Sequence, residues 1–67
     1  MKIKFDKQAD AAYIYFKEIA PGEVVKTISL NDSVNIDLDV DDKTLGIEIL
    51  QASKNLPETT LNSAIMI

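Results

Sequence analysis

VNIDLDV at residues 34–40 and TLGIEIL at residues 44–50 are the most regular part of this 67-residue sequence. Apolar and polar side chains alternate along the first segment and most of the second, which is typical of strands that bury one face. A two-residue turn at Asp42 and Lys43 would oppose only apolar pairs, and directly opposed residues share a face. The predicted pairs are Val40 with Leu45, Leu38 with Ile47, and Ile36 with Ile49.

Alternation of the same kind predicts three further strands, near residues 2–5, 12–17 and 24–30. Polar residues and the Pro21-Gly22 dipeptide separate them, as expected of turns. Opposed apolar residues again set the register, with a three-residue loop at 31–33. The predicted pairs are Phe5 with Ala12, Ile3 with Ile14, Leu30 with Val34, and Ile28 with Ile36.

The last residues follow a different period. Pro57 fits the first turn of a helix, and Leu61, Ala64 and Ile65 follow at helical spacing. We therefore expect an α+β, mostly β fold: a five-stranded antiparallel meander with a short C-terminal helix covering one face. The alternative is that residues 64–67 extend and dock on a second copy.

The amino-acid composition limits the metal sites and catalytic groups that the chain can form. Residues 1–67 suffice for a single domain. The chain has no cysteine and no histidine, so the usual ligands of zinc, copper and iron–sulfur sites are missing, as are a histidine base and a thiol nucleophile. We expect no enzymatic activity and no cofactor.

The charge and hydropathy of the chain limit the classes of molecule that we expect it to bind. The net charge is −4, and the seven basic residues are all lysine, which argues against nucleic-acid binding. No segment approaches the ~20 apolar residues that span a bilayer, so we expect a cytoplasmic protein. Residues 1–17 hold four lysines and two acids, whereas residues 32–48 hold six acids and one lysine. This asymmetry would steer a basic partner, or it reflects ordinary solvated strand faces.

Two segments carry a family resemblance: FDKQADAAYIYF from Phe5 and VNIDLDVDDKTLGIEILQASK from Val34. Together they resemble the bacterial domain-of-unknown-function family 2283 over residues 1–54, leaving 55–67 as a helix or tail. The matching positions are Asp6, Ala9, Asp10, Ala11, Tyr13, Gly46, Ile47, Glu48 and Ile49.

The resemblance implies a fold and no established activity, although some members resemble the antitoxin half of toxin–antitoxin gene pairs in their genomic setting. Family members tend to have aspartate–glycine where this chain has Asp41-Asp42. Asp42 is therefore expected to adopt the left-handed backbone conformation, which aspartate tolerates better than most residues.

Acidic residues suggest a candidate metal site. Asp37, Asp39 and Asp41, with Glu48 eleven residues after Asp37, have the spacing of a calcium loop. Asp42 occupies the glycine position of that loop, and the alternation predicts a strand instead. The predicted register places Asp37 opposite Glu48 on the outer face. This carboxylate pair would be screened by water, or would bind Mg²⁺ or Ca²⁺ with Asp39 as a further ligand.

Tyrosines suggest a candidate protein-binding patch. On the outer face, the first hairpin opposes Tyr13 with Lys4 and Tyr15 with Lys2. These pairs are compatible with weak cation–π contacts alone. Together with Leu50 on the same face, the two tyrosines also fit a protein-binding surface, because aromatic residues are enriched at interfaces.

We therefore expect a non-enzymatic module that binds a small basic protein, with an antitoxin-like role as the resemblance implies. The alternative is a structural domain that self-associates, as a homodimer that buries the apolar tail and has no dedicated partner.

Overall fold

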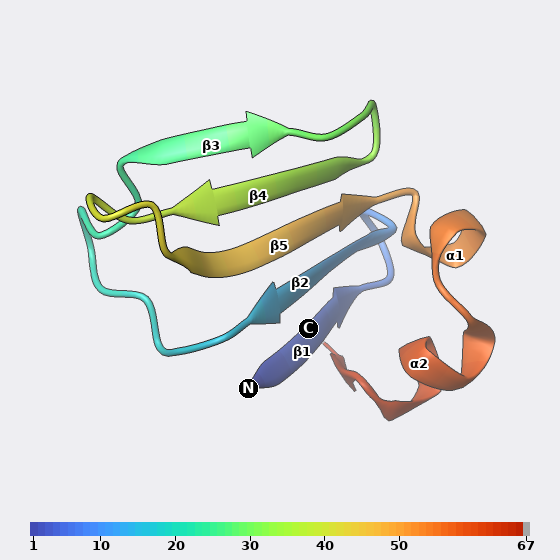
Figure 1. The fold of residues 1–67 in the computed structure, drawn as a ribbon. Helices are drawn as coiled ribbons and strands as arrows, with labels where there is room; N and C mark the ends of the chain where they lie inside the picture. Colours follow the sequence, from blue (N-terminus) through green and yellow to red (C-terminus); the bar gives the residue numbers. More distant parts are fainter. Residues whose placement is uncertain (67) are drawn as a thin grey trace.

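The computed structural model describes residues 1–66, which form six strands in one mixed sheet and two short helices (Figure 1). The predicted mostly β class is confirmed. The strands are β1 (Lys2–Asp6), β2 (Ala11–Tyr15), β3 (Lys26–Ser29), β4 (Val34–Leu38), β5 (Thr44–Leu50) and β6 (Ile65–Met66). The helices are α1 (Ala52–Asn55) and α2 (Glu58–Ser63), and in this part of the chain no helix is long and apolar enough to cross a membrane.

The strand order is β3-β4-β5-β2-β1-β6, so the sheet is not the simple meander that we expected. β5 lies between β4 and β2 and pairs antiparallel with both (Figure 1). β5 is the longest strand and is strongly apolar. A central position hydrogen-bonds its backbone on both sides, whereas the end of a meander would leave one side unpaired.

The register is as predicted in two hairpins and shifted in the third. Pairing between β1 and β2 and between β3 and β4 agrees with the prediction, including Ile3 with Ile14 and Ile28 with Ile36. Between β4 and β5, however, Ile36 lies opposite Ile47 and not opposite Ile49. A shift of two residues keeps Val34 to Asp37 on their predicted faces, because the side-chain period of a strand is two. An irregularity between Asp37 and Leu38 changes the register once more, so that Leu38 lies opposite Thr44.

The cause of the shift is the connection between β4 and β5, which is longer than a two-residue turn. The Asp39 carboxylate accepts hydrogen bonds from the backbone N–H of Asp41 at 2.8 Å and of Lys43 at 2.9 Å. Asp42 has φ 61°, so the expected left-handed conformation is confirmed. The side chain of Asp39 thus stabilises a wider loop than hydrophobic pairing alone predicts.

One face of the sheet carries one isoleucine from each of the five antiparallel strands, at directly opposed positions. We call this set the isoleucine row. In strand order from β3 to β1 it consists of Ile28, Ile36, Ile47, Ile14 and Ile3.

The helices cover only one end of this face. Buried Phe5, Ala12, Ile49 and Ala52 form the centre of the core, and apolar side chains of the C-terminal segment pack against them. The packed side chains from that segment are Leu56, Leu61 and Ala64. Figure 1 shows both helices beyond the end of β5 and near β1, away from β3 and β4.

The chain leaves its helical conformation earlier than predicted. Ala64 ends α2 with an extended backbone, and Ile65, expected on the helix, lies in β6. β6 pairs in parallel with β1 of the same chain. The extended alternative was therefore correct about conformation. Whether this segment also contacts a second copy stays a prediction, and Ile67 lies outside the described residues.

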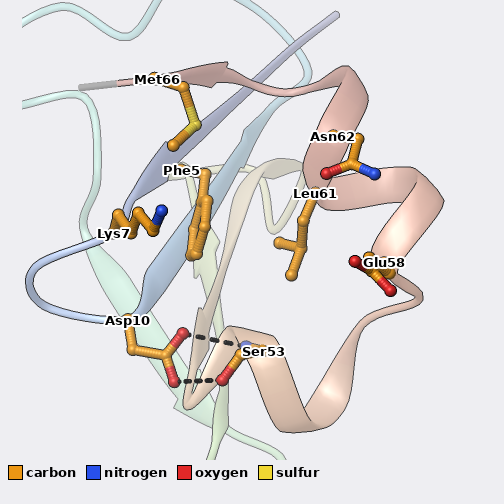
Figure 2. A pocket seen from close by; sticks show the side chains of 8 residues that line it. All are labelled: Phe5, Lys7, Asp10, Ser53, Glu58, Leu61, Asn62 and Met66. Atoms are coloured by element: carbon orange, nitrogen blue, oxygen red, sulfur yellow. Dashed lines mark hydrogen bonds between the residues drawn. The ribbon is translucent and has the colours of Figure 1, made fainter.

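Asp10 joins the first hairpin to α1. Its carboxylate accepts hydrogen bonds from the Ser53 backbone N–H at 3.0 Å and from the Ser53 hydroxyl at 2.7 Å (Figure 2). The Asp10 carbonyl also accepts a hydrogen bond from the N–H of Ala52 at 2.9 Å. Gln51 begins the helix without a capping hydrogen bond from its own side chain, so an aspartate 43 residues away from Ser53 satisfies this end instead.

We predict that Asp10→Gly lowers the free energy of unfolding by about 1–2 kcal/mol, because the cap of α1 is lost. Asp10 has φ 52°, which glycine adopts without strain. The lost free energy of unfolding therefore measures the contribution of the carboxylate. Asp42→Gly is the matched control, since it also removes an aspartate at positive φ. We expect it to stay within about 1 kcal/mol of the unchanged protein, because its exposed ion pair with Lys26 contributes little. Urea denaturation measures both, and equal effects would contradict the capping role.

Candidate functional site

The outer face of the sheet, opposite the isoleucine row, carries two tyrosines in its centre. Tyr13 lies between Lys4 on β1 and Glu48 on β5, and Tyr15 lies between Lys2 and Gly46. The two rings stack, with centroids 6.3 Å apart and planes inclined by 23°. Both side chains are partly buried, so they form a fixed aromatic ridge along β2.

The lysine contact differs from the expected one. The opposed pairs Lys4–Tyr13 and Lys2–Tyr15 are present in the backbone register. The ammonium of Lys4, however, lies 5.9 Å from the ring centroid of Tyr15, its diagonal neighbour. Diagonal positions in a sheet are within reach of a long side chain, so Lys4 can contact Tyr15 in place of its directly opposed neighbour Tyr13. Such an exposed contact contributes about 0.5–1 kcal/mol.

Polar pairs flank the tyrosines on the other side. Asn35 lies opposite Glu48 and donates a hydrogen bond from Nδ2 to its Oε1 at 3.0 Å. Asp37 accepts a hydrogen bond from the hydroxyl of Thr27 at 2.7 Å. Both carboxylates are thereby oriented, and each keeps acceptor capacity on a second oxygen.

Gly46 creates a depression between the tyrosines and these acids. A Cβ at Gly46 would lie 2.8 Å from the carbonyl oxygen of Ile14, so only glycine allows β5 to approach β2 here. A hollow of about 330 Å³ lies over this position, and we call it the Gly46 hollow. The side chains of Tyr13, Tyr15, Ile19, Asn35, Asp37 and Glu48 contribute to its lining.

The environment of Tyr13 alters its acidity. Partial burial is the main cause that raises the pKa of Tyr13 above its usual value of 10.0, and the negative charge of Glu48 raises it further. Because the folded state holds this proton more tightly than the unfolded state, Tyr13 contributes stability below pH 10 that is lost as pH rises through its folded pKa.

The three proposed metal ligands do not form one site: Asp37 and Glu48 both line the Gly46 hollow, and Asp39 does not. Asp37 lies opposite Gly46 and not opposite Glu48, so the predicted carboxylate pair is wrong, because the register is shifted by two residues. Asp39 is engaged in the loop after β4. Among residues 1–66, no group of three or more aspartate, glutamate, histidine or cysteine side chains is arranged to hold a metal ion.

Leu50 shares the outer face with the tyrosines and lies opposite Ala11. It is 36% exposed and does not line the Gly46 hollow. The sequence prediction missed Asn35, Thr27 and Ile19. The face of the sheet on which Asn35 and Thr27 lie could be inferred from the alternation. Their pairing with acids on neighbouring strands could not, because it depends on the register.

A second concave region, of about 740 Å³, lies where the C-terminal segment meets β1 (Figure 2). Phe5, Leu61 and Met66 form its apolar part. Its polar pair, Asp10 with Ser53, is occupied in fixing α1. The Asp10–Ser53 pair is therefore explained by the fold itself, and the other polar side chains of the lining are Lys7, Glu58 and Asn62.

The chemistry of the Gly46 hollow favours a cation. It offers two aromatic rings on one side and two carboxylates on the other. The ion pairs found within residues 1–66 are Lys17–Glu23 and Lys26–Asp42, so neither Asp37 nor Glu48 has a basic partner there. A guanidinium or ammonium group of another molecule fits this arrangement.

We predict that Glu48→Gln lowers the pKa of Tyr13, because a neighbouring negative charge is removed. Asp37→Asn is the control: it removes the other carboxylate of the hollow, which is not a cause of the Tyr13 shift. A pH titration of the Tyr13 ring signals by NMR measures both variants. An unchanged pKa in Glu48→Gln would contradict a contribution of the Glu48 charge to the acidity of Tyr13.

A comparison with family models matches residues 2–53 to the family described as "Protein of unknown function (DUF2283)". Searches among curated proteins and among solved structures gave no match. The matched segment covers β1 to β5 and the start of α1, including Asp10, Tyr13, Gly46 and Glu48. On this match over most of its length, the chain belongs to the DUF2283 family.

Proposed function

We propose that this protein is a non-enzymatic module that binds a small basic protein, and that a basic side chain of the partner enters the Gly46 hollow. The observation that carries the proposal is the joint placement of stacked Tyr13 and Tyr15 with the carboxylates of Asp37 and Glu48 around a position without a side chain.

Arginine is the best match among basic side chains. Its planar guanidinium stacks on an aromatic ring and donates several hydrogen bonds in a fixed geometry. In the hollow, one face of the guanidinium would contact the tyrosine ridge while its N–H groups reach the two carboxylates. Since both carboxylates are held by Asn35 and Thr27, little side-chain entropy is lost on binding.

The distribution of charge supports a basic partner over the whole molecule. The net charge is −4, and the acids are concentrated in residues 32–48, which contain β4 and most of β5. A field of this kind increases the rate at which a basic protein associates and disfavours acidic competitors.

An antitoxin-like role is the form of this proposal that the family resemblance suggests, with a basic toxin as the partner. The cytoplasmic location expected from the sequence stays a prediction, and it is compatible with such a role.

The test is a titration with a blocked Gly-Arg-Arg-Gly peptide, followed by NMR. We predict shifts in the signals of Tyr13, Tyr15, Asp37 and Glu48. The double variant Asp37→Asn/Glu48→Gln should weaken binding about tenfold, because two charge-assisted contacts are lost. Substitution of both peptide arginines by glutamine should abolish the shifts.

Asp32→Asn/Asp41→Asn is the matched control, because it changes the net charge equally at exposed positions outside the hollow. If it weakens binding as much as the hollow variant, the attraction is unspecific and the proposal fails. A basic protein that co-purifies from the source cells should bind again when it is purified. Its affinity should fall about tenfold for the hollow variant and stay unchanged for the control.

A further inference from the structure

We propose that two copies of this chain associate through the isoleucine row, face to face, to form a two-layered β dimer. This inference concerns the face opposite the Gly46 hollow and is independent of the proposed function.

The isoleucine row is incompletely covered by its own chain. Ile28 is 46% exposed, and the other four members are only partly buried. Leu30, which follows Ile28 on the same face, is 67% exposed. The helices lie at the other end of this face (Figure 1). Val34 of β4 packs against the core at that end, and within residues 1–66 β3 and the rest of β4 have no second layer over them. A sheet with an apolar face is stable when another layer covers it.

The core that the chain forms alone is small. The buried apolar residues within the described part of the chain are Phe5, Ala11, Ala12, Leu38, Leu45, Ile49 and Ala52, three of which are alanine. A chain of this length buries too little surface to gain a large margin of stability alone. Covering the isoleucine row would extend the core over β3 and β4.

The exposed area is sufficient for a dimer. The chain exposes 4718 Å², whereas a compact monomer of 7.4 kDa is expected to expose about 4200 Å². This excess of about 500 Å² belongs to the whole chain, and Ile28 and Leu30 contribute to it. An interface that buried about 500 Å² on each copy, about 1,000 Å² in total, would have the lower size of specific interfaces.

The chemistry of the row favours a second copy over a charged partner. All five positions are isoleucine, so the row offers no charge or hydrogen-bonding group to a polar surface. Lys26 lies two residues before Ile28 on the same face, opposite Leu38 and beside the row, and its ammonium is already paired with Asp42 at 2.9 Å. A two-fold axis places the part of the row on β3, β4 and β5 against the same part of the second copy, which matches apolar with apolar.

The geometry of the layers also fits. Packed sheets lie about 10 Å apart, which is close to the thickness of one helix. The strands of the second copy would therefore occupy the same layer as α1 and α2, beside them over β3, β4 and β5. The helices would then limit the dimer to one position on the sheet.

The test is sedimentation equilibrium over concentrations from about 1 μM to about 1 mM, with a dimer expected to form in this range. Ile28→Ser and, separately, Leu30→Ser should each raise the dissociation constant about tenfold or more. Both residues are well exposed in the single chain, so we expect the variants to fold, and circular dichroism checks this.

Leu50→Ser is the matched control, because it removes an exposed leucine from the opposite face and should leave the dissociation constant unchanged. Asp37→Asn/Glu48→Gln should also dimerise normally, which separates this inference from the binding of a basic partner. A monomer at every concentration would overturn the proposal. A dimer weakened by Ile65→Ser and not by Ile28→Ser would overturn it as well, since the interface would then lie at β6.

Discussion

The pairing of β2 with β5 is the interaction on which the rest of the structure depends. It joins two locally built units, the β1–β2 hairpin and the β3–β4–β5 segment, into one sheet. At Gly46 the two strands approach so closely that a side chain would meet the carbonyl oxygen of Ile14. The same pairing completes the isoleucine row on one face and places the tyrosine ridge beside Glu48 on the other.

The face of the sheet on which each side chain lies was predictable from the sequence. The exact residue pairs were predictable in two hairpins and not in the third. Alternation over residues 34–50 correctly assigned Ile36, Ile47 and Ile49 to one face, because that assignment depends only on the period of a strand. Register depends on the loop as well. The hydrogen bonds that Asp39 makes to its own loop favour a longer connection, and hydrophobic pairing gives no signal for them.

Contacts distant in sequence were the other source of error. Nothing local indicates that β5 returns to β2, or that Asp10 caps a helix that begins at Ala52. The candidate site was consequently predicted in part: Tyr13, Tyr15 and Glu48 were identified, while the partners that orient the acids were not. The predicted Asp37–Glu48 pair failed for a local reason, because the loop that Asp39 stabilises shifts the register of β4 against β5.

The connectivity of the sheet also determines how the chain can fold. The β1–β2 and β3–β4–β5 units each close through short connections, so each can form early at a small entropic cost. Joining them brings Ala11 next to Leu50, which requires closure of a long loop. Until that closure, β2 and β5 both present unpaired edges, and any delay at this step exposes the chain to aggregation. From this topology we expect the pairing of β2 with β5 to be the slow step of folding.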